Sequence, residues 1–190
     1  MEIPQAVEFS HYLLARQIDE GDFVIDATCG NGNDTGFLAR LVGEFGRVLA
    51  LDIQEEAIEA TEMELRERGL KEQVELKQAN HSNILSLVDI EKMRPKGIVF
   101  NLGYLPGGDK SVVTEVVNTL PALEDSLELL GNEGILVVTA YPGHEEGLKE
   151  REEIEAWAEK LDYKKFLVGH YRFINQEKNP PEVFVIQKRL

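Results

Sequence analysis

Short apolar runs alternate with segments of helical spacing along most of the chain. Five of the runs predict β-strands, because each is brief and is bounded by glycine or polar residues; they lie at residues 23–25, 47–51, 74–78, 97–101 and 134–140. Apolar residues three and four positions apart predict helices, which lie at residues 10–18, 34–42, 54–68, 111–130 and 145–161. Ser10 is the expected cap of the first helix, and Pro121 is expected to kink or split the fourth.

The end of the chain has a different pattern. Residues 163–173 and 182–188 predict two strands joined by a polar, proline-containing connection, which is typical of an antiparallel hairpin. Strand–helix alternation followed by a hairpin predicts an α/β fold with a mostly parallel, seven-stranded Rossmann-like sheet and helices on both faces. This is the architecture of class I methyltransferases. The sequence has no internal repeat, low-complexity tract or linker, so residues 1–190 are expected to form a single domain.

The loop after the first predicted strand decides which ligand is expected. Asp26 ends the strand and glycines follow four and six residues later, whereas a dinucleotide loop has its first glycine directly after the strand. Thr35 stands where that motif needs its third glycine. A carboxylate here would repel pyrophosphate but suits a cationic ligand, which favours S-adenosylmethionine over NAD. The residues expected around the methionine end of this donor are Asp26, Gly30, Asn31, Gly32 and Asn33.

Polar residues also end the second and third predicted strands, where an open α/β sheet binds its ligands. Asp52 is expected to accept both ribose hydroxyls, with Gln54 beside the ribose or the adenine. The alternative role of Asp52 is to cap the helix that follows. Asn80 and His81 end the third strand, where the adenine is expected, although a lone histidine is often only a structural group.

The sequence Asn101-Leu-Gly-Tyr104, at the end of the fourth strand, is the candidate reaction site, and Asn101 is also expected to contact the donor. Amino-group methyltransferases carry a related Asn-Pro-Pro-Tyr pattern there. In that pattern the amide oxygen and nearby carbonyls accept hydrogen bonds from the target nitrogen, and the ring stacks on the base. Leu-Gly in place of Pro-Pro departs from the pattern and puts an exocyclic base nitrogen in question. The alternative is a turn in which Tyr104 covers apolar surface.

Two segments are expected to wall the substrate pocket. The first is glycine-rich and ends in a lysine suited to a phosphate; its substrate-contacting residues are Tyr104, Leu105, Pro106, Gly107, Gly108 and Lys110. The second brings His144 to the same rim after the fifth strand. His144 or Asp109 is the candidate acceptor for a proton from an ammonium substrate. The alternative interpretation is that His144 and Asp109 are ordinary exposed loop residues.

Composition sets outer bounds on these expectations. The net charge of −15 argues against a general nucleic-acid coat protein but allows an enzyme that holds one RNA through a local patch. Cys29 is the single cysteine, which excludes an internal disulfide and fits a reducing cytoplasm. No signal peptide or bilayer-spanning run is seen, and four scattered histidines give no metal-ligand spacing. We therefore expect a cytoplasmic protein without a metal or a membrane partner; the sequence leaves a homodimer open.

These segments together resemble the small bacterial "putative rRNA methylase" family. The resemblance extends over essentially the whole chain and is carried by residues 26–39, 52–54, 101–110, 142–144, 175 and 179–181. It implies a class I S-adenosylmethionine-dependent methyltransferase. The residues that it assigns to the donor are Asn31, Asn33, Asp52, Gln54, Asn80 and His81.

The resemblance also implies a tRNA substrate, in which the amine of 5-aminomethyl-2-thiouridine at the wobble position is methylated. Such an alkyl amine is nucleophilic once it is neutral, so the site mainly has to deprotonate and align it. Methylation of ribosomal RNA or of a small-molecule amine is the alternative, and a non-catalytic donor-binding module is a third reading. For the anticodon stem-loop, an expected path uses cations of the C-terminal segment, which could equally be solvated charges: Lys164, Lys165, Arg172, Lys178, Lys188 and Arg189.

Overall fold

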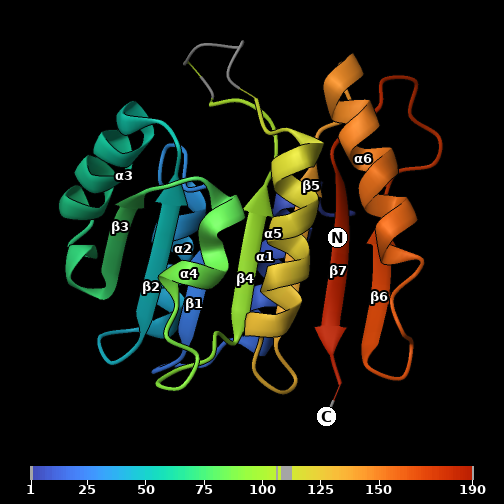
Figure 1. Ribbon diagram of the computed structural model, residues 1–190. Helices are drawn as coiled ribbons and strands as arrows, with labels where there is room; N and C mark the ends of the chain where they lie inside the picture. The colour runs from blue at the N-terminus through green and yellow to red at the C-terminus, as the bar shows by residue number, and fades with distance from the viewer. Residues whose placement is uncertain (1, 106, 108–112, 190) are drawn as a thin grey trace.

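The computed structural model describes residues 2–105, 107 and 113–189. Its centre is a seven-stranded sheet of order β3-β2-β1-β4-β5-β7-β6 (Figure 1). The strands are β1 (Phe23–Asp26), β2 (Arg47–Asp52), β3 (Val74–Gln78), β4 (Gly97–Asn101), β5 (Ile135–Ala140), β6 (Phe166–Tyr171) and β7 (Glu182–Lys188). The first five are parallel, and β7 runs antiparallel to both β5 and β6. The predicted mostly parallel sheet and its C-terminal antiparallel hairpin are confirmed.

Helices cover both faces of the sheet. They are α1 (Ala6–Gln17), α2 (Asn33–Val42), α3 (Glu55–Glu67), α4 (Ile84–Leu87), α5 (Val116–Leu129) and α6 (Glu145–Ala158). In Figure 1, α4, α5 and α6 lie in front of the sheet, and α1 and α2 lie behind it. Successive residues of a strand point to opposite faces, so Ile25 and Ile98 join the core under α5 whereas Val24 and Val99 join the core under α1 and α2.

Several predicted helix and strand limits are wrong, among them the end of the helix predicted at residues 145–161, which ends at Ala158. The first helix begins at Ala6, with Gln5 as its N-cap, and Ser10 lies inside it with its hydroxyl donating to the Val7 carbonyl. The helix predicted from residue 111 begins at Val116 and contains Pro121. The strand predicted at residues 163–173 is limited to β6. The sequence pattern also predicts no helix in some segments that contain short helical turns. These are the 3-10 turns Lys71–Gln73 and His81–Asn83 and the single turn of α4.

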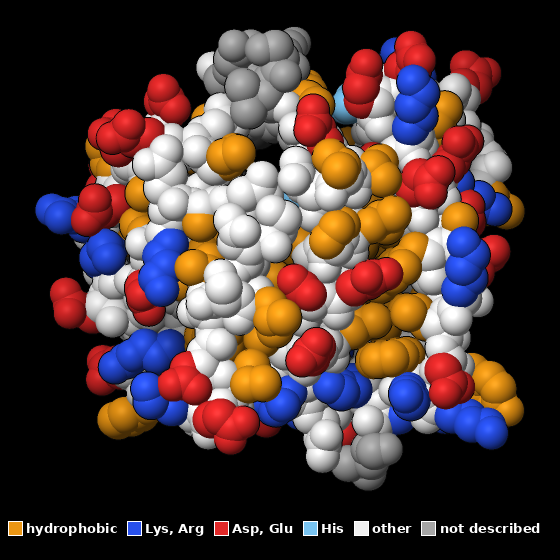
Figure 2. Space-filling model, in the orientation of Figure 1, with side chains coloured by type: hydrophobic (Ala, Val, Ile, Leu, Met, Phe, Trp, Pro, Cys, Tyr) orange, Lys and Arg blue, Asp and Glu red, His pale blue; other side chains and the backbone are white. Residues whose placement is uncertain are grey.

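Strand direction separates the cations of the C-terminal segment into two groups. Lys164 and Lys165 precede β6 and Lys188 ends β7, which places them where the parallel strands begin. Figure 2 shows Lys and Arg side chains gathered along this lower end of the molecule. Lys188 is engaged there with carbonyls at the end of α5. Arg172 and Lys178 lie in the β6–β7 connection, at the opposite end of the sheet.

No helix in the described ranges is long and apolar enough to cross a membrane.

Candidate functional site

A cavity of about 1260 Å³ opens at the carboxyl ends of the parallel strands. The strand order reverses between β1 and β4, and a crevice at such a reversal is where open α/β sheets bind ligands. Most residues predicted from the sequence line it: Gly30, Asn31, Asn33, Asp52, Gln54, Asn80, His81, Asn101, Tyr104, Leu105 and His144. Asp26, Gly32 and Gly107 are not among the lining residues. Pro106, Gly108, Asp109 and Lys110 lie outside the described residues.

Asp26 does not contact the cavity, which corrects its expected place around the donor. Its side chain is fully buried and accepts hydrogen bonds from the Thr35 hydroxyl (2.6 Å) and the Thr28 backbone N–H (3.2 Å). Burial, followed by the charge of Asp34, raises the pKa of Asp26 to about 7. Asp26 therefore stabilises the loop from inside the core, and the carboxylates of the β1–β2 side that line the cavity are Asp34 and Asp52.

Gly32 also serves the loop rather than the cavity. It is the N-cap of α2 with a left-handed φ of 81°, a conformation that glycine adopts without strain. A Cβ at this position would lie 3.0 Å from the Cα of Thr61 on α3, so a side chain would clash with backbone. The Thr61 hydroxyl donates to the Gly30 carbonyl (2.9 Å) and ties the loop to α3.

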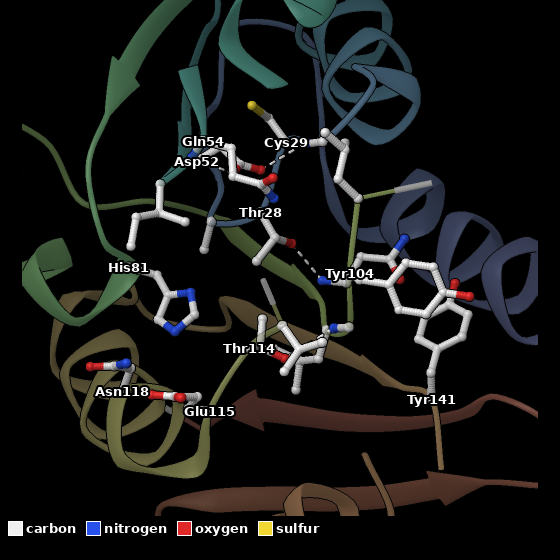
Figure 3. Close-up of a pocket in the computed structure, with 18 of the residues that line it drawn as sticks. Thr28, Cys29, Asp52, Gln54, His81, Tyr104, Thr114, Glu115, Asn118 and Tyr141 are labelled. Carbon is white, nitrogen blue, oxygen red and sulfur yellow. Dashed lines mark hydrogen bonds between the residues drawn. The ribbon is translucent and has the colours of Figure 1, made fainter. Parts of the chain in front are cut away.

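Asp52 holds the loop and faces the cavity at the same time. One carboxylate oxygen accepts from the Gly30 N–H (3.0 Å), and the other accepts from the Gln54 N–H (3.0 Å). Gln54 is the N-cap of α3, so the alternative that Asp52 itself caps this helix is wrong. A carboxylate has about four lone-pair positions, so two remain for a ligand on the cavity side, where Asp52 and Gln54 lie together (Figure 3).

Asn80 and His81 enter the cavity from the end of β3. The Asn80 side chain accepts from the Ser82 N–H (2.9 Å) and so caps the following 3-10 turn. His81 is 9% exposed, and its Nε2 has no hydrogen-bond partner in the part of the chain that is described. Burial lowers the pKa of His81 to about 4, so the ring is neutral at pH 7. A buried ring nitrogen that has no hydrogen-bond partner in the protein is suited to a hydrogen bond with a polar ligand atom.

The other half of the cavity is formed after β4 and β5. The backbone N–H of Asn101 donates to the Thr28 hydroxyl (2.7 Å), which fixes this strand end against the β1 loop. Tyr104 is 41% exposed, and its ring centroid lies 6.4 Å from that of His144. Leu105 leans back over the β1 loop, where a Cβ on Gly30 would lie 3.6 Å from its Cδ1. Figure 3 shows Tyr104 and Tyr141 on the side of the cavity opposite His81.

His144 has a structural task in addition to lining the cavity. It is the N-cap of α6, and its Nδ1 accepts from the Gly147 N–H (3.1 Å). A neutral imidazole has one donor and one acceptor nitrogen, so this cap places the proton of the neutral ring on Nε2. To take up a further proton, His144 would have to give up the cap.

Several residues that shape this half of the cavity were not predicted from the sequence. Asp34, in the first turn of α2, accepts from His11 of α1 and from the Asn101 amide. Buried Glu150 of α6 accepts from the Thr114 hydroxyl (2.7 Å), which in turn accepts from the Gly103 N–H (3.0 Å). These pairs join residues 11 to 67 positions apart, so no local motif signals them.

Within the described residues, no three His, Cys, Asp or Glu side chains gather in a way that could hold a metal ion.

Comparison with known proteins agrees with this geometry. The family model described as "Putative rRNA methylase" matches residues 48–187. The chain belongs to this family. A model of protein-L-isoaspartate O-methyltransferase matches residues 3–83, less than half of the chain.

Two known proteins are similar to this chain over nearly all of its length. The "tRNA (mnm(5)s(2)U34)-methyltransferase, chloroplastic" of Arabidopsis thaliana is 38% identical over 192 residues, which cover 97% of this chain and 70% of the relative. The crystal structure of a "putative rRNA-methylase" from Clostridium thermocellum is 42% identical, with a TM-score of 0.95 over 99% of this chain and all of that one.

A "putative methyltransferase" from Streptococcus mutans, solved in complex with S-adenosylhomocysteine, is 35% identical with a TM-score of 0.88. It covers 98% of this chain, and 99% of its own length is matched. The chain described here is therefore an S-adenosylmethionine-dependent methyltransferase.

Proposed function

We propose that the enzyme methylates the alkyl amine of 5-aminomethyl-2-thiouridine at the wobble position of tRNA. One observation carries this proposal: Asn101 and Tyr104 line the same cavity as Asp52 and His81. A polar amide and a half-exposed aromatic ring therefore face the expected donor site. The relative from Arabidopsis, whose name states this tRNA position, is similar over 97% of the chain. Location in the cytoplasm and assembly into a homodimer stay predictions.

The residues on the β1–β3 side fit the methyl donor. The oxygens of Asp52 left open toward the cavity suit the ribose hydroxyls, and the unpartnered Nε2 of His81 suits the adenine edge. Gly30, with a left-handed φ of 51°, lets the loop backbone approach the methionine part closely. We assign Asn31, Asn33, Gln54 and Asn80, which line the same side, to the donor as well. When bound, S-adenosylmethionine supplies an electrophilic methyl group.

The residues on the β4–β5 side are assigned to the acceptor. The Asn101 amide oxygen accepts a hydrogen bond from the amine and aligns its lone pair, and Tyr104 stacks on the splayed-out base. The amine must lose its proton to attack, and free negative charge nearby would oppose this. Asp34 lines the cavity, and its two oxygens accept hydrogen bonds from His11 and Asn101.

The position of the cations limits how the RNA is held. Asn179 and Pro181 of the β6–β7 connection line the cavity, so Arg172 and Lys178 of the same connection are the C-terminal cations on the correct side for the anticodon stem-loop. Lys164, Lys165 and Lys188 lie at the opposite end of the sheet from the cavity. They are therefore not expected to contact the same stretch of RNA. We therefore expect binding to fall with salt with a slope that counts only a few phosphates.

The substrate is tested with matched RNAs. Purified enzyme is given tRNA bearing 5-aminomethyl-2-thiouridine, the same tRNA without the aminomethyl arm, and a free alkyl amine, across a salt series. We expect transfer to the armed tRNA alone, declining as salt rises. Equal transfer to the unarmed tRNA would contradict the amine as the target. Transfer to the free amine but to neither tRNA would favour a small-molecule methyltransferase.

His144→Asn separates the two tasks of this residue. Asparagine is a favoured N-cap, so thermal unfolding should stay near that of the wild type, whereas His144→Ala should lose roughly 1 kcal/mol of stability. If the imidazole takes part in proton removal, turnover of His144→Asn should fall and should recover as pH rises, because more of the amine is then neutral. Full turnover at every pH would show that His144 is only a cap.

A further inference from the structure

We propose that Asp34 and His11 are positioning residues for the methyl acceptor: they decide which end of the Asn101 amide faces the substrate amine. This inference rests on the proposed function, because it concerns the atom that receives the acceptor. The three side chains come from α1, α2 and the end of β4 and meet at the cavity wall. Asp34 and Asn101 line the cavity directly, and His11 stands behind Asp34.

The direction of the Asn101 amide follows from the chemistry of its neighbour. The Asn101 Nδ2 lies 3.0 Å from Asp34 Oδ2. An ionised carboxylate only accepts hydrogen bonds, so the amide group that faces it must be the NH2 and the oxygen must face elsewhere. Without that carboxylate the amide could rotate by 180° and present its NH2 to the substrate. An NH2 donor would repel the N–H groups of an incoming amine instead of accepting from them.

Tyr141 is compatible with this arrangement. Its hydroxyl lies near the Asn101 side chain, and burial, followed by the charge of Asp34, raises its pKa. The hydroxyl therefore keeps its proton at neutral pH. An amide oxygen has two lone pairs, so one is left for the amine even where the Tyr141 hydroxyl donates to the other.

His11 holds the carboxylate in place. Its Nε2 lies 2.6 Å from Asp34 Oδ1, and its ring is stacked on Phe37 with centroids 3.9 Å apart and planes 7° apart. The side chain of His11 is 27% exposed and that of Asp34 is 12% exposed. The carboxylate thus has one oxygen for the histidine and one for the amide, and stacking prevents the imidazole from turning away.

The competing explanation is purely structural: the His11–Asp34 contact could serve only to fasten α1 to α2. The two explanations differ in what a second mutation does. If Asp34 acts through Asn101, then removal of Asp34 matters only while the Asn101 amide is present. If it only fastens helices, its removal lowers stability and leaves the turnover of folded enzyme unchanged.

A double-mutant cycle on kcat tests this, with methylation of armed tRNA at saturating donor as the assay. Asp34→Ala should lower kcat on the order of tenfold or more, yet in the Asn101→Ala background it should cost less than about twofold. His11→Phe, which keeps a ring on Phe37, should show a smaller loss of the same kind. Asp89→Asn removes one negative charge from an exposed ion pair with Lys92 far from the cavity and is the charge-matched control.

A second readout is independent of turnover. The side-chain NH2 signals of Asn101, assigned by their loss in Asn101→Ala, should shift and exchange faster with water in Asp34→Ala than in Asp89→Asn. Unchanged NH2 signals, or losses in kcat that simply add, would overturn the inference. Absence of transfer by the wild-type enzyme would instead contradict the proposed substrate, so the two failures are distinguishable.

Discussion

Asn101→Ala is expected to lower turnover about a hundredfold or more, while affinity for S-adenosylhomocysteine changes by less than about twofold. The amide lies at the end of β4 on the acceptor side of the cavity, and its backbone, not its side chain, is bonded to the β1 loop through Thr28. Removal of the side chain therefore leaves that bond intact. Single-turnover methylation of armed tRNA gives the rate of the chemical step, and calorimetry gives donor affinity.

Tyr104 supplies the matched comparison. If its ring stacks on the wobble base, Tyr104→Phe should keep most of the turnover and Tyr104→Ala should lose it, mainly through weaker tRNA binding of about 1–3 kcal/mol. Equal loss of donor affinity and turnover in Asn101→Ala would move Asn101 into the donor site. Normal turnover in both alanine variants would remove the acceptor assignment from this strand end.

The parts of the fold that the sequence predicts well are those with a strong local pattern. The limits of β3, β4 and β7 agree with the predicted ones, because each is a clear apolar or alternating run with turn residues beside it. The predicted start of the first helix was wrong because Gln5 and Glu8 form a capping box at the N-terminus of α1. Gln is not among the usual N-cap residues, so the sequence does not signal this cap. The short turn of α4 depends on packing against α5 and not on local periodicity.

The sequence predicts those cavity-lining residues that lie at or shortly after a strand end: Asp52 and Asn101 are the last residues of β2 and β4, and His81 follows β3 by three residues. Asp26 also ends a strand, but its side chain turns inward to Thr35, and strand position alone does not show this. His11 was missed because it lies in a helix that precedes the first strand and reaches the cavity only through Asp34. Cations that are neighbours in the sequence are divided between the two ends of the sheet, because β7 runs antiparallel to β5 and places Lys188 where the parallel strands begin.

Asp52→Ala is expected to weaken S-adenosylhomocysteine binding by about 1.5–3 kcal/mol, the range of charge-assisted hydrogen bonds to the ribose. The same carboxylate also orders the β1 loop through the Gly30 N–H, so part of any loss could come from a loosened loop. Asp52→Asn is the first comparison, because it keeps one acceptor oxygen and nearly the same shape.

Thr61→Val separates the two contributions to the Asp52 effect. It removes another bond that ties the loop, from the buried Thr61 hydroxyl to the Gly30 carbonyl, without removing a group that lines the cavity. If ribose binding dominates, calorimetry should show a much larger loss of affinity for Asp52→Ala than for Thr61→Val, with both variants folded by thermal unfolding. Equal losses would mean that Asp52 acts by ordering the loop. Unchanged affinity in folded Asp52→Ala would remove it from the donor site, because a ribose acceptor cannot be deleted without cost.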